Sequence, residues 1–173
     1  MSISCILQVE DDANDVFLLQ RALAQAGVRL PVQVASDGEM AINYLAGTPP
    51  YDNRSKYPMP GLILLDLKLP RRSGREVLEW IRARPNLRRV VVVVFTTAQY
   101  VGDVGLAYDL GANSFLVKPA DFSQYVGIAR LLKDWWLTLN QYAPVNEATW
   151  PLAMNYAEAQ RYLGIRPEDR GRP

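Results

Sequence analysis

The chain has 173 residues, with 19 basic and 18 acidic side chains, one cysteine and no histidine. About half of the residues are apolar, which is typical of a globular protein and excludes a disordered one. Without histidine, this chain cannot form a serine–histidine–aspartate triad or a zinc site with histidine ligands. The chemistry that remains is that of carboxylates, hydroxyls, amines and hard cations such as Mg²⁺.

Targeting signals are not evident. No apolar run approaches the roughly 20 residues that a membrane helix needs, and the first residues have no basic stretch ahead of an apolar segment. One cysteine cannot form an internal disulfide, which suits a reducing compartment. We therefore expect a cytoplasmic protein that does not bind membranes.

Apolar runs alternate with amphipathic segments along most of the chain. The runs predict buried strands at 3–9, 30–35, 62–65, 90–95 and 114–117. The other segments predict helices at 13–26, 37–46, 75–84, 100–110 and 121–139. Strands without polar alternation indicate a parallel sheet covered on both faces. The predicted fold class is therefore α/β, a doubly wound five-stranded parallel sheet flanked by helices.

Two segments depart from this alternation. Residues 48–61 contain four prolines and predict a long surface loop between a helix and a strand. Residues 141–173 are too few for an independent core, so we expect one domain at 1–140 with a C-terminal extension and no separate output domain. A short helix is predicted there, beginning near Trp150-Pro151 and ending near Gly164. Its apolar face would pack on its own domain or on a partner subunit.

Polar side chains gather where the predicted strands end, and these ends meet at one edge of a parallel sheet. They are Glu10, Asp11, Asp12, Asp66, Thr96, Thr97 and Lys118. Two carboxylates ~4 Å apart repel each other by about 4 kcal/mol at an effective dielectric constant near 20. The acids therefore require cations, which Lys118 and a Mg²⁺ ion with oxygen ligands can supply.

The spacing of these residues is as informative as their type. Val9-Glu10-Asp11-Asp12 follows the first strand, and Leu64-Leu65-Asp66-Leu67-Lys68-Leu69-Pro70 spans the end of the third. Gly74 lies eight residues beyond Asp66, Thr96 lies thirty beyond it, and Lys118-Pro119 begins twenty-two residues beyond Thr96. In this order and spacing, residues 3–140 resemble the CheY-like receiver domain of two-component response regulators.

The resemblance implies a role for each matching residue. Asp66 would accept a phosphoryl group, and Mg²⁺ would be held by Glu10, Asp11, Asp66 and the backbone carbonyl of Lys68. The phosphoryl-binding and switch residues would be Thr96, Thr97, Lys118 and Phe115. Lys118-Pro119 is predicted to be a cis peptide. Because the chain has no histidine, the donor must be a partner histidine kinase or phosphotransfer protein.

The predicted protein is a signalling receiver rather than an enzyme, although it would slowly hydrolyse its own acyl phosphate. One alternative is a receiver-like docking module that is never phosphorylated. Another is a Mg²⁺-dependent phosphatase with an aspartate nucleophile, which needs an acid two residues after Asp66, where this chain has Lys68. Residues 68–89 hold eight basic and two acidic side chains, but we expect a solvated helix face there rather than a nucleic-acid site.

The last predicted helix of the domain carries an apolar stripe and two adjacent tryptophans. Together with the extension, it supplies the interface candidates Tyr125, Ile128, Leu132, Trp135, Trp136, Leu152, Tyr156 and Leu163. The long loop, the Thr96-Thr97 pair and the Asp134-Trp135-Trp136-Leu137 segment resemble the small response regulators that serve phytochrome-type light-sensing histidine kinases. That resemblance implies a homodimer formed through the last helices.

Overall fold

The computed structural model describes residues 3–98 and 100–142. Five strands form one parallel sheet in the order β2-β1-β3-β4-β5, which confirms the predicted fold class. The strands are β1 (Ile6–Val9), β2 (Val32–Ala35), β3 (Leu62–Leu65), β4 (Val91–Thr96) and β5 (Ser114–Val117). The helices are α1 (Ala13–Gln25), α2 (Gly38–Ala46), α3 (Gly74–Arg82), α4 (Val101–Asp109), α5 (Phe122–Leu132) and a π-helical segment, η1 (Lys133–Leu139).

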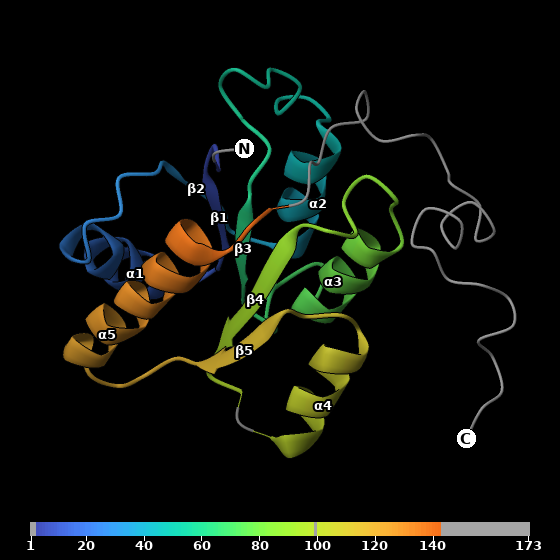
Figure 1. Ribbon diagram of the computed structural model, residues 1–173. Helices are drawn as coiled ribbons and strands as arrows, with labels where there is room; N and C mark the ends of the chain where they lie inside the picture. The colour runs from blue at the N-terminus through green and yellow to red at the C-terminus, as the bar shows by residue number, and fades with distance from the viewer. Residues whose placement is uncertain (1–2, 99, 143–173) are drawn as a thin grey trace, which may run out of the picture. The chain divides into compact units, whose positions relative to one another are not determined.

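Helices cover both faces of the sheet, with α1 and α5 on one side and α2, α3 and α4 on the other (Figure 1). Successive residues of a strand point to opposite faces. In β3, Leu62 and Leu64 therefore pack under α1 and α5, whereas Ile63 and Leu65 pack under α2 and α3. Strands β1, β3 and β4 are buried on both faces, which explains their continuous apolar sequences.

Side chains at the helix N-termini fix where three of the helices begin. The carboxylates of Asp12 and Asp37 accept hydrogen bonds from backbone N–H groups in the first turns of α1 and α2. Ser73 and Glu76 form a reciprocal capping box at the start of α3. Because the α1 cap follows the end of β1 by three residues, it also fixes the backbone around the acids at the end of that strand.

The last helix differs from the single helix predicted at 121–139. Regular α-helix ends at Leu132, and residues 133–139 form a π-helix with wider turns. The core-facing positions of the last helix include Tyr125, Ala129, Leu132 and Trp136, so the inward-facing residue after Leu132 is Trp136 rather than the predicted Trp135. Trp136 packs against the core, whereas Trp135 is 60% exposed.

The long loop at 48–61 is held to the domain by contacts with α2. The Arg54 guanidinium donates hydrogen bonds to the backbone carbonyls of Tyr44 and Leu45, at the end of α2. Tyr51 and Tyr57 pack on the ring of Tyr44. The loop therefore packs on α2 through these contacts.

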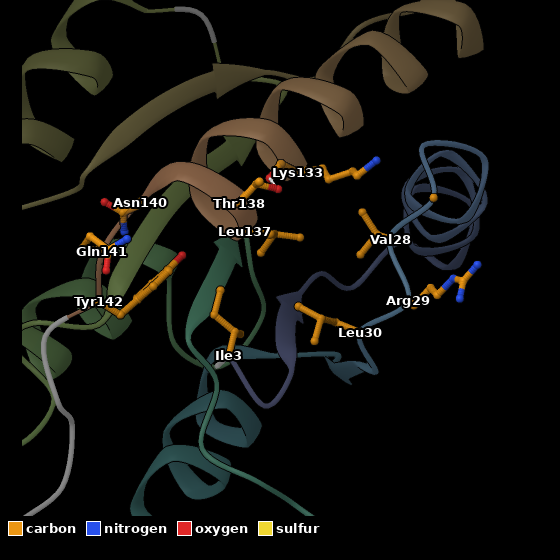
Figure 2. A pocket seen from close by; sticks show the side chains of 11 residues that line it. Ile3, Val28, Arg29, Leu30, Lys133, Leu137, Thr138, Asn140, Gln141 and Tyr142 are labelled. Atoms are coloured by element: carbon orange, nitrogen blue, oxygen red, sulfur yellow. Dashed lines mark hydrogen bonds between the residues drawn. The ribbon is translucent and has the colours of Figure 1, made fainter. Parts of the chain in front are cut away.

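A cavity of about 390 Å³ lies where the α1–β2 connection meets η1. Figure 2 shows the side chains of Ile3, Leu30 and Leu137 directed into it, with Tyr142 at its other side. Ile3 precedes β1, so the cavity is at the sheet edge opposite the strand-end acids. None of the predicted phosphoryl-binding or metal-binding residues lines it.

Candidate functional site

The carboxyl ends of β1, β3 and β4, together with the residue that follows β5, bring four predicted site residues into contact. They are Glu10, Asp66, Thr96 and Lys118, all of them buried. The parallel register of β3, β4 and β5 places the ends of these strands side by side. The Lys118 backbone N–H donates to the Thr96 carbonyl oxygen at 2.8 Å, which continues the β4–β5 ladder one residue beyond β5.

The ammonium group of Lys118 is the centre of the site. It forms ion pairs with Glu10, with Asp66 Oδ2 at 2.6 Å and with Asp15 Oδ2 at 2.8 Å. Burial lowers the pKa of Lys118, but the hydrogen bonds that its ammonium donates to Asp15, Asp66 and Glu10 outweigh that effect and raise it overall. Lys118 is therefore fully charged.

Glu10 shows the opposite balance. Burial raises its pKa to about 7, although the hydrogen bond and the positive charge of Lys118 oppose the rise. Burial is thus the main reason that Glu10 holds a proton more readily than an exposed carboxyl group does.

Asp66 is 5% exposed and its two carboxylate oxygens have different partners. Oδ1 accepts hydrogen bonds from Thr96 Oγ1 at 2.6 Å and from the Lys68 backbone N–H at 3.0 Å. Oδ2 accepts from Lys118 Nζ. A short bond from a buried hydroxyl to a carboxylate is of the stronger, charge-assisted kind. The Asp66 carboxylate is therefore held in one orientation.

Asp15 was not among the predicted site residues. It lies in the first turn of α1, where its Oδ2 accepts from Lys118 and its Oδ1 accepts from the Tyr125 hydroxyl at 3.3 Å. The prediction considered only residues at strand ends and so overlooked a helix residue. An acid three positions after the helix cap Asp12 was the available signal, because the start of α1 follows directly on β1.

Other predicted residues lie at the rim. Asp11 and Thr97 are exposed. Of the two adjacent threonines, Thr96 rather than Thr97 donates a hydrogen bond to Asp66. Asp12 caps α1, which gives a role to an acid that the sequence left without one. The side chain of Lys68 is exposed, while its backbone N–H contacts Asp66.

The predicted cis peptide at Lys118-Pro119 is wrong. Among the described residues, the cis bond is Pro49-Pro50. Lys118 reaches the acids because its backbone extends the β4–β5 ladder and because three carboxylates hold its ammonium. Phe115 is half-buried and packs against the small cluster of Leu67, Val94 and Ala107.

The predicted interface residues divide into four groups. Tyr125 and Leu132 are 2% and 3% exposed, so assigning them to an interface was wrong: both face α1 and the sheet. Ile128 and Trp136 are partly buried against the same core, and only Trp135 is largely exposed. The remaining candidates, Leu152, Tyr156 and Leu163, lie outside the described residues.

The basic residues between 68 and 89 mostly have partners within the chain. Arg71 pairs with Asp37, Arg72 with Glu76, and Arg75 with Asp103. Arg82 donates to backbone carbonyls and to Asn113. These contacts favour the predicted helix face over a nucleic-acid site. Among the described helices, none is both long and apolar enough to cross a membrane.

The charges of the site fit a divalent cation. Three carboxylates around one ammonium leave two negative charges, and Asp11 adds a third at the rim. Carboxylate and carbonyl oxygens are the ligands that Mg²⁺ prefers. Within the described residues, however, no three acidic or thiol side chains converge as a ready metal cluster. Glu10 and Asp66 instead form ion pairs with Lys118. For a metal ion to bind these carboxylates, some of their contacts with the ammonium must break.

Residues 6–130 match the family model of the response regulator receiver domain, and the chain belongs to this family. It is a phosphorelay response regulator, a class that generally signals rather than catalyses. The chain is 36% identical over 132 residues to the response regulator Rcp1 of Synechocystis sp. (strain ATCC 27184 / PCC 6803 / Kazusa), which covers 76% of this chain and 88% of Rcp1.

Two solved structures show the same likeness. The phosphorylated cyanobacterial phytochrome response regulator RcpA is 38% identical with a TM-score of 0.76, over 83% of this chain and all of RcpA. The Mn²⁺-bound form of Rcp1 is 34% identical with a TM-score of 0.74, over 82% of this chain and 99% of that one.

Proposed function

We propose that Asp66 is the phosphoacceptor of this response regulator. The observation that carries the proposal is the pair of hydrogen bonds that its carboxylate accepts. One oxygen accepts from Thr96 Oγ1, and the other accepts from Lys118 Nζ. A hydroxyl and an ammonium in these places can also bind the oxygens of a phosphoryl group attached to Asp66. Such fixed donors stabilise charge that develops during transfer.

The reaction is a transfer between proteins. A carboxylate oxygen of Asp66 attacks the phosphorus of a phosphohistidine on the donor, a P–O bond forms, and the P–N bond breaks. The donor imidazole leaves with the electron pair of that bond and takes up a proton. Water later hydrolyses the acyl phosphate, which releases inorganic phosphate and restores the Asp66 carboxylate.

Mg²⁺ is the proposed cofactor, held by Glu10, Asp11, Asp66 and the carbonyl oxygen of Lys68. When bound, it would neutralise negative charge on the transferring phosphoryl oxygens. The excess negative charge around Lys118 supports the proposal, as does the Mn²⁺-bound form of the relative Rcp1.

The proposed donor is a histidine kinase of the phytochrome type, or a phosphotransfer protein that serves one. Support comes from the relatives, because the similar structure of RcpA is that of a cyanobacterial phytochrome response regulator. We propose a cytoplasmic location, which agrees with this partnership. It also agrees with the free thiol of Cys5, which is buried and has a pKa raised by burial.

Incubation of the full chain with acetyl phosphate and Mg²⁺ tests the acceptor. We expect a mass gain of one phosphoryl group that is absent in Asp66→Asn and retained in Asp12→Asn, whose side chain still caps α1. Mass spectrometry of the intact protein provides the measurement. No gain in any condition would favour the docking module, and steady turnover of varied phosphoesters would favour the phosphatase.

The proposed donor is tested separately. Asp66 should take ³²P from an autophosphorylated phytochrome-type kinase faster than from an unrelated histidine kinase.

The output is proposed to be a change in protein–protein contacts, including formation of a homodimer through the end of α5. Leu131, Trp135 and Leu139, which we call the α5–η1 surface, are each at least 60% exposed. They recur every four residues and so lie along one side of the helix. Large apolar side chains gathered in this way favour an interface with another protein.

Sedimentation of the wild type and of Trp135→Ala tests this dimer. Removing an exposed aromatic anchor should weaken association at least tenfold without changing the unfolding temperature, because anchors of this kind contribute about 2 kcal/mol or more to binding. Phe17→Ala is the matched control, since Phe17 is equally exposed but lies on α1. A wild-type chain that sediments as a monomer both with and without phosphorylation would contradict the dimer.

A further inference from the structure

Within residues 3–98 and 100–142, the Lys118 ammonium has three carboxylate partners, and two of them are needed for other tasks in the proposed reaction. Asp66 becomes the phosphorylated residue, and Glu10 is a proposed Mg²⁺ ligand. Asp15 has neither task. Its 2.8 Å contact is therefore the one carboxylate contact of Lys118 that can persist throughout the phosphorylation cycle.

Asp15 is itself held in place. It sits one turn into α1, three residues after the cap Asp12, and its other oxygen accepts from the Tyr125 hydroxyl. Tyr125 is buried, and its ring packs edge-on against Phe95 of β4. The Asp15 carboxylate thus joins α1, α5 and the residue after β5 by accepting two hydrogen bonds, one on each oxygen.

We propose that Asp15 is a positioning residue that anchors the Lys118 ammonium, so that Lys118 keeps its place when Asp66 and Glu10 exchange partners. The proposal rests on the proposed function of Asp66. With the anchor weakened, the ammonium samples more positions and meets a phosphoryl oxygen in the productive one less often. Formation and hydrolysis of the acyl phosphate should both slow, because both pass through the same phosphoryl-bound arrangement.

The first test compares Asp15→Asn with Asp12→Asn in the full chain. Both remove one negative charge from the start of α1, but only Asp15 contacts Lys118. We expect Asp15→Asn to slow phosphorylation by acetyl phosphate and hydrolysis of the product by roughly five- to tenfold each, as the loss of one charge-assisted hydrogen bond allows. Asp12→Asn should change neither rate more than twofold. Equal effects of the two variants would overturn the anchor.

The second test requires neither a metal ion nor phosphorylation. Unfolding temperatures are measured in EDTA for Asp15→Asn, for Lys118→Met and for the double variant. Asp15→Asn should lower the unfolding temperature by about 2–4 °C when Lys118 is present. It should raise the temperature in the Lys118→Met background, where Asp15 repels the other two acids and keeps, of these contacts, the 3.3 Å hydrogen bond from Tyr125. The same sign in both backgrounds would overturn the proposal.

These tests separate two failures. If the wild type gains no phosphoryl group, the proposed function fails, whereas the unfolding experiment still reports on the Asp15–Lys118 contact. If Asp66 is phosphorylated but Asp15→Asn behaves like Asp12→Asn, only the role of Asp15 fails. Tyr125→Phe provides a further control, because it removes the hydroxyl and leaves both charges in place.

Discussion

Lys118→Met should abolish most of the phosphoacceptor activity and also destabilise the fold. Lys118 is 3% exposed at its side chain and contacts three carboxylates, so its removal leaves those charges buried without a counter-charge. Breaking a buried ion pair by removing one partner typically costs about 3–5 kcal/mol. Loss of one fixed donor to the reacting group should slow phosphorylation by about 10²–10³-fold.

The destabilisation should grow with pH. Burial already raises the pKa of Glu10 to about 7 with the ammonium present, and removing the ammonium raises it further. The folded variant then binds more protons than the unfolded chain between pH 5 and pH 8, so its free energy of unfolding falls as the pH rises. Urea unfolding at these two pH values in EDTA measures the difference. Lys133→Met is the control, and a Lys118→Met chain as stable as that control at pH 8 would contradict the prediction.

Gly74→Ala should produce a large loss of stability at a position that carries no functional side chain. A Cβ atom at Gly74 would lie 2.0 Å from the backbone oxygen of Asp66 and 2.8 Å from Leu67 Cα. Neither backbone atom can move without displacing the start of α3 or the acceptor itself. We expect a loss of about 4 kcal/mol or more, which is at the extreme for single substitutions.

Gly105→Ala is the matched control for this variant. Nothing lies within 4 Å of a Cβ atom at Gly105, which is inside α4. Alanine should stabilise that helix by about 0.5–1 kcal/mol because glycine has more conformational freedom to lose on folding. If the space around each glycine determines the change in stability, the unfolding temperature falls in Gly74→Ala and rises in Gly105→Ala. Thermal unfolding of both variants measures this. A Gly74→Ala chain that melts within 2 °C of the wild type would show that the acceptor loop is softer than its contacts indicate.

The sheet and much of the site could be predicted because each depended on simple local rules. Continuous apolar runs indicated buried parallel strands, and the ends of such strands meet at one edge, which placed Glu10, Asp66, Thr96 and Lys118 together. The strands at 62–65 and 114–117 were predicted with the bounds that the structure has.

The errors came from choices that no local rule decides. The apolar stripe was continued from Leu132 to Trp135, whereas Trp136 packs against the core. The single α-helix predicted there was wrong because residues 133–139 form a π-helix, and only packing determines where such a turn occurs. Asp15 was overlooked because it lies on α1, whereas the prediction considered only residues at strand ends. The Lys118-Pro119 bond was predicted to be cis from the resemblance to receiver domains, whereas the cis bond among the described residues is Pro49-Pro50 and long-range ion pairs hold the lysine.

Strand β5 forms the margin of the sheet, with a hydrogen-bonded neighbour on one side only. Asp66 follows β3, which is bracketed by β1 and β4, whereas Lys118 follows this margin. The site thus joins an acceptor that follows a strand paired on both sides to a lysine that follows a strand paired on one side. We expect a change of charge on the acceptor to displace the lysine and β5 first, at the border of the sheet, where another molecule can contact them.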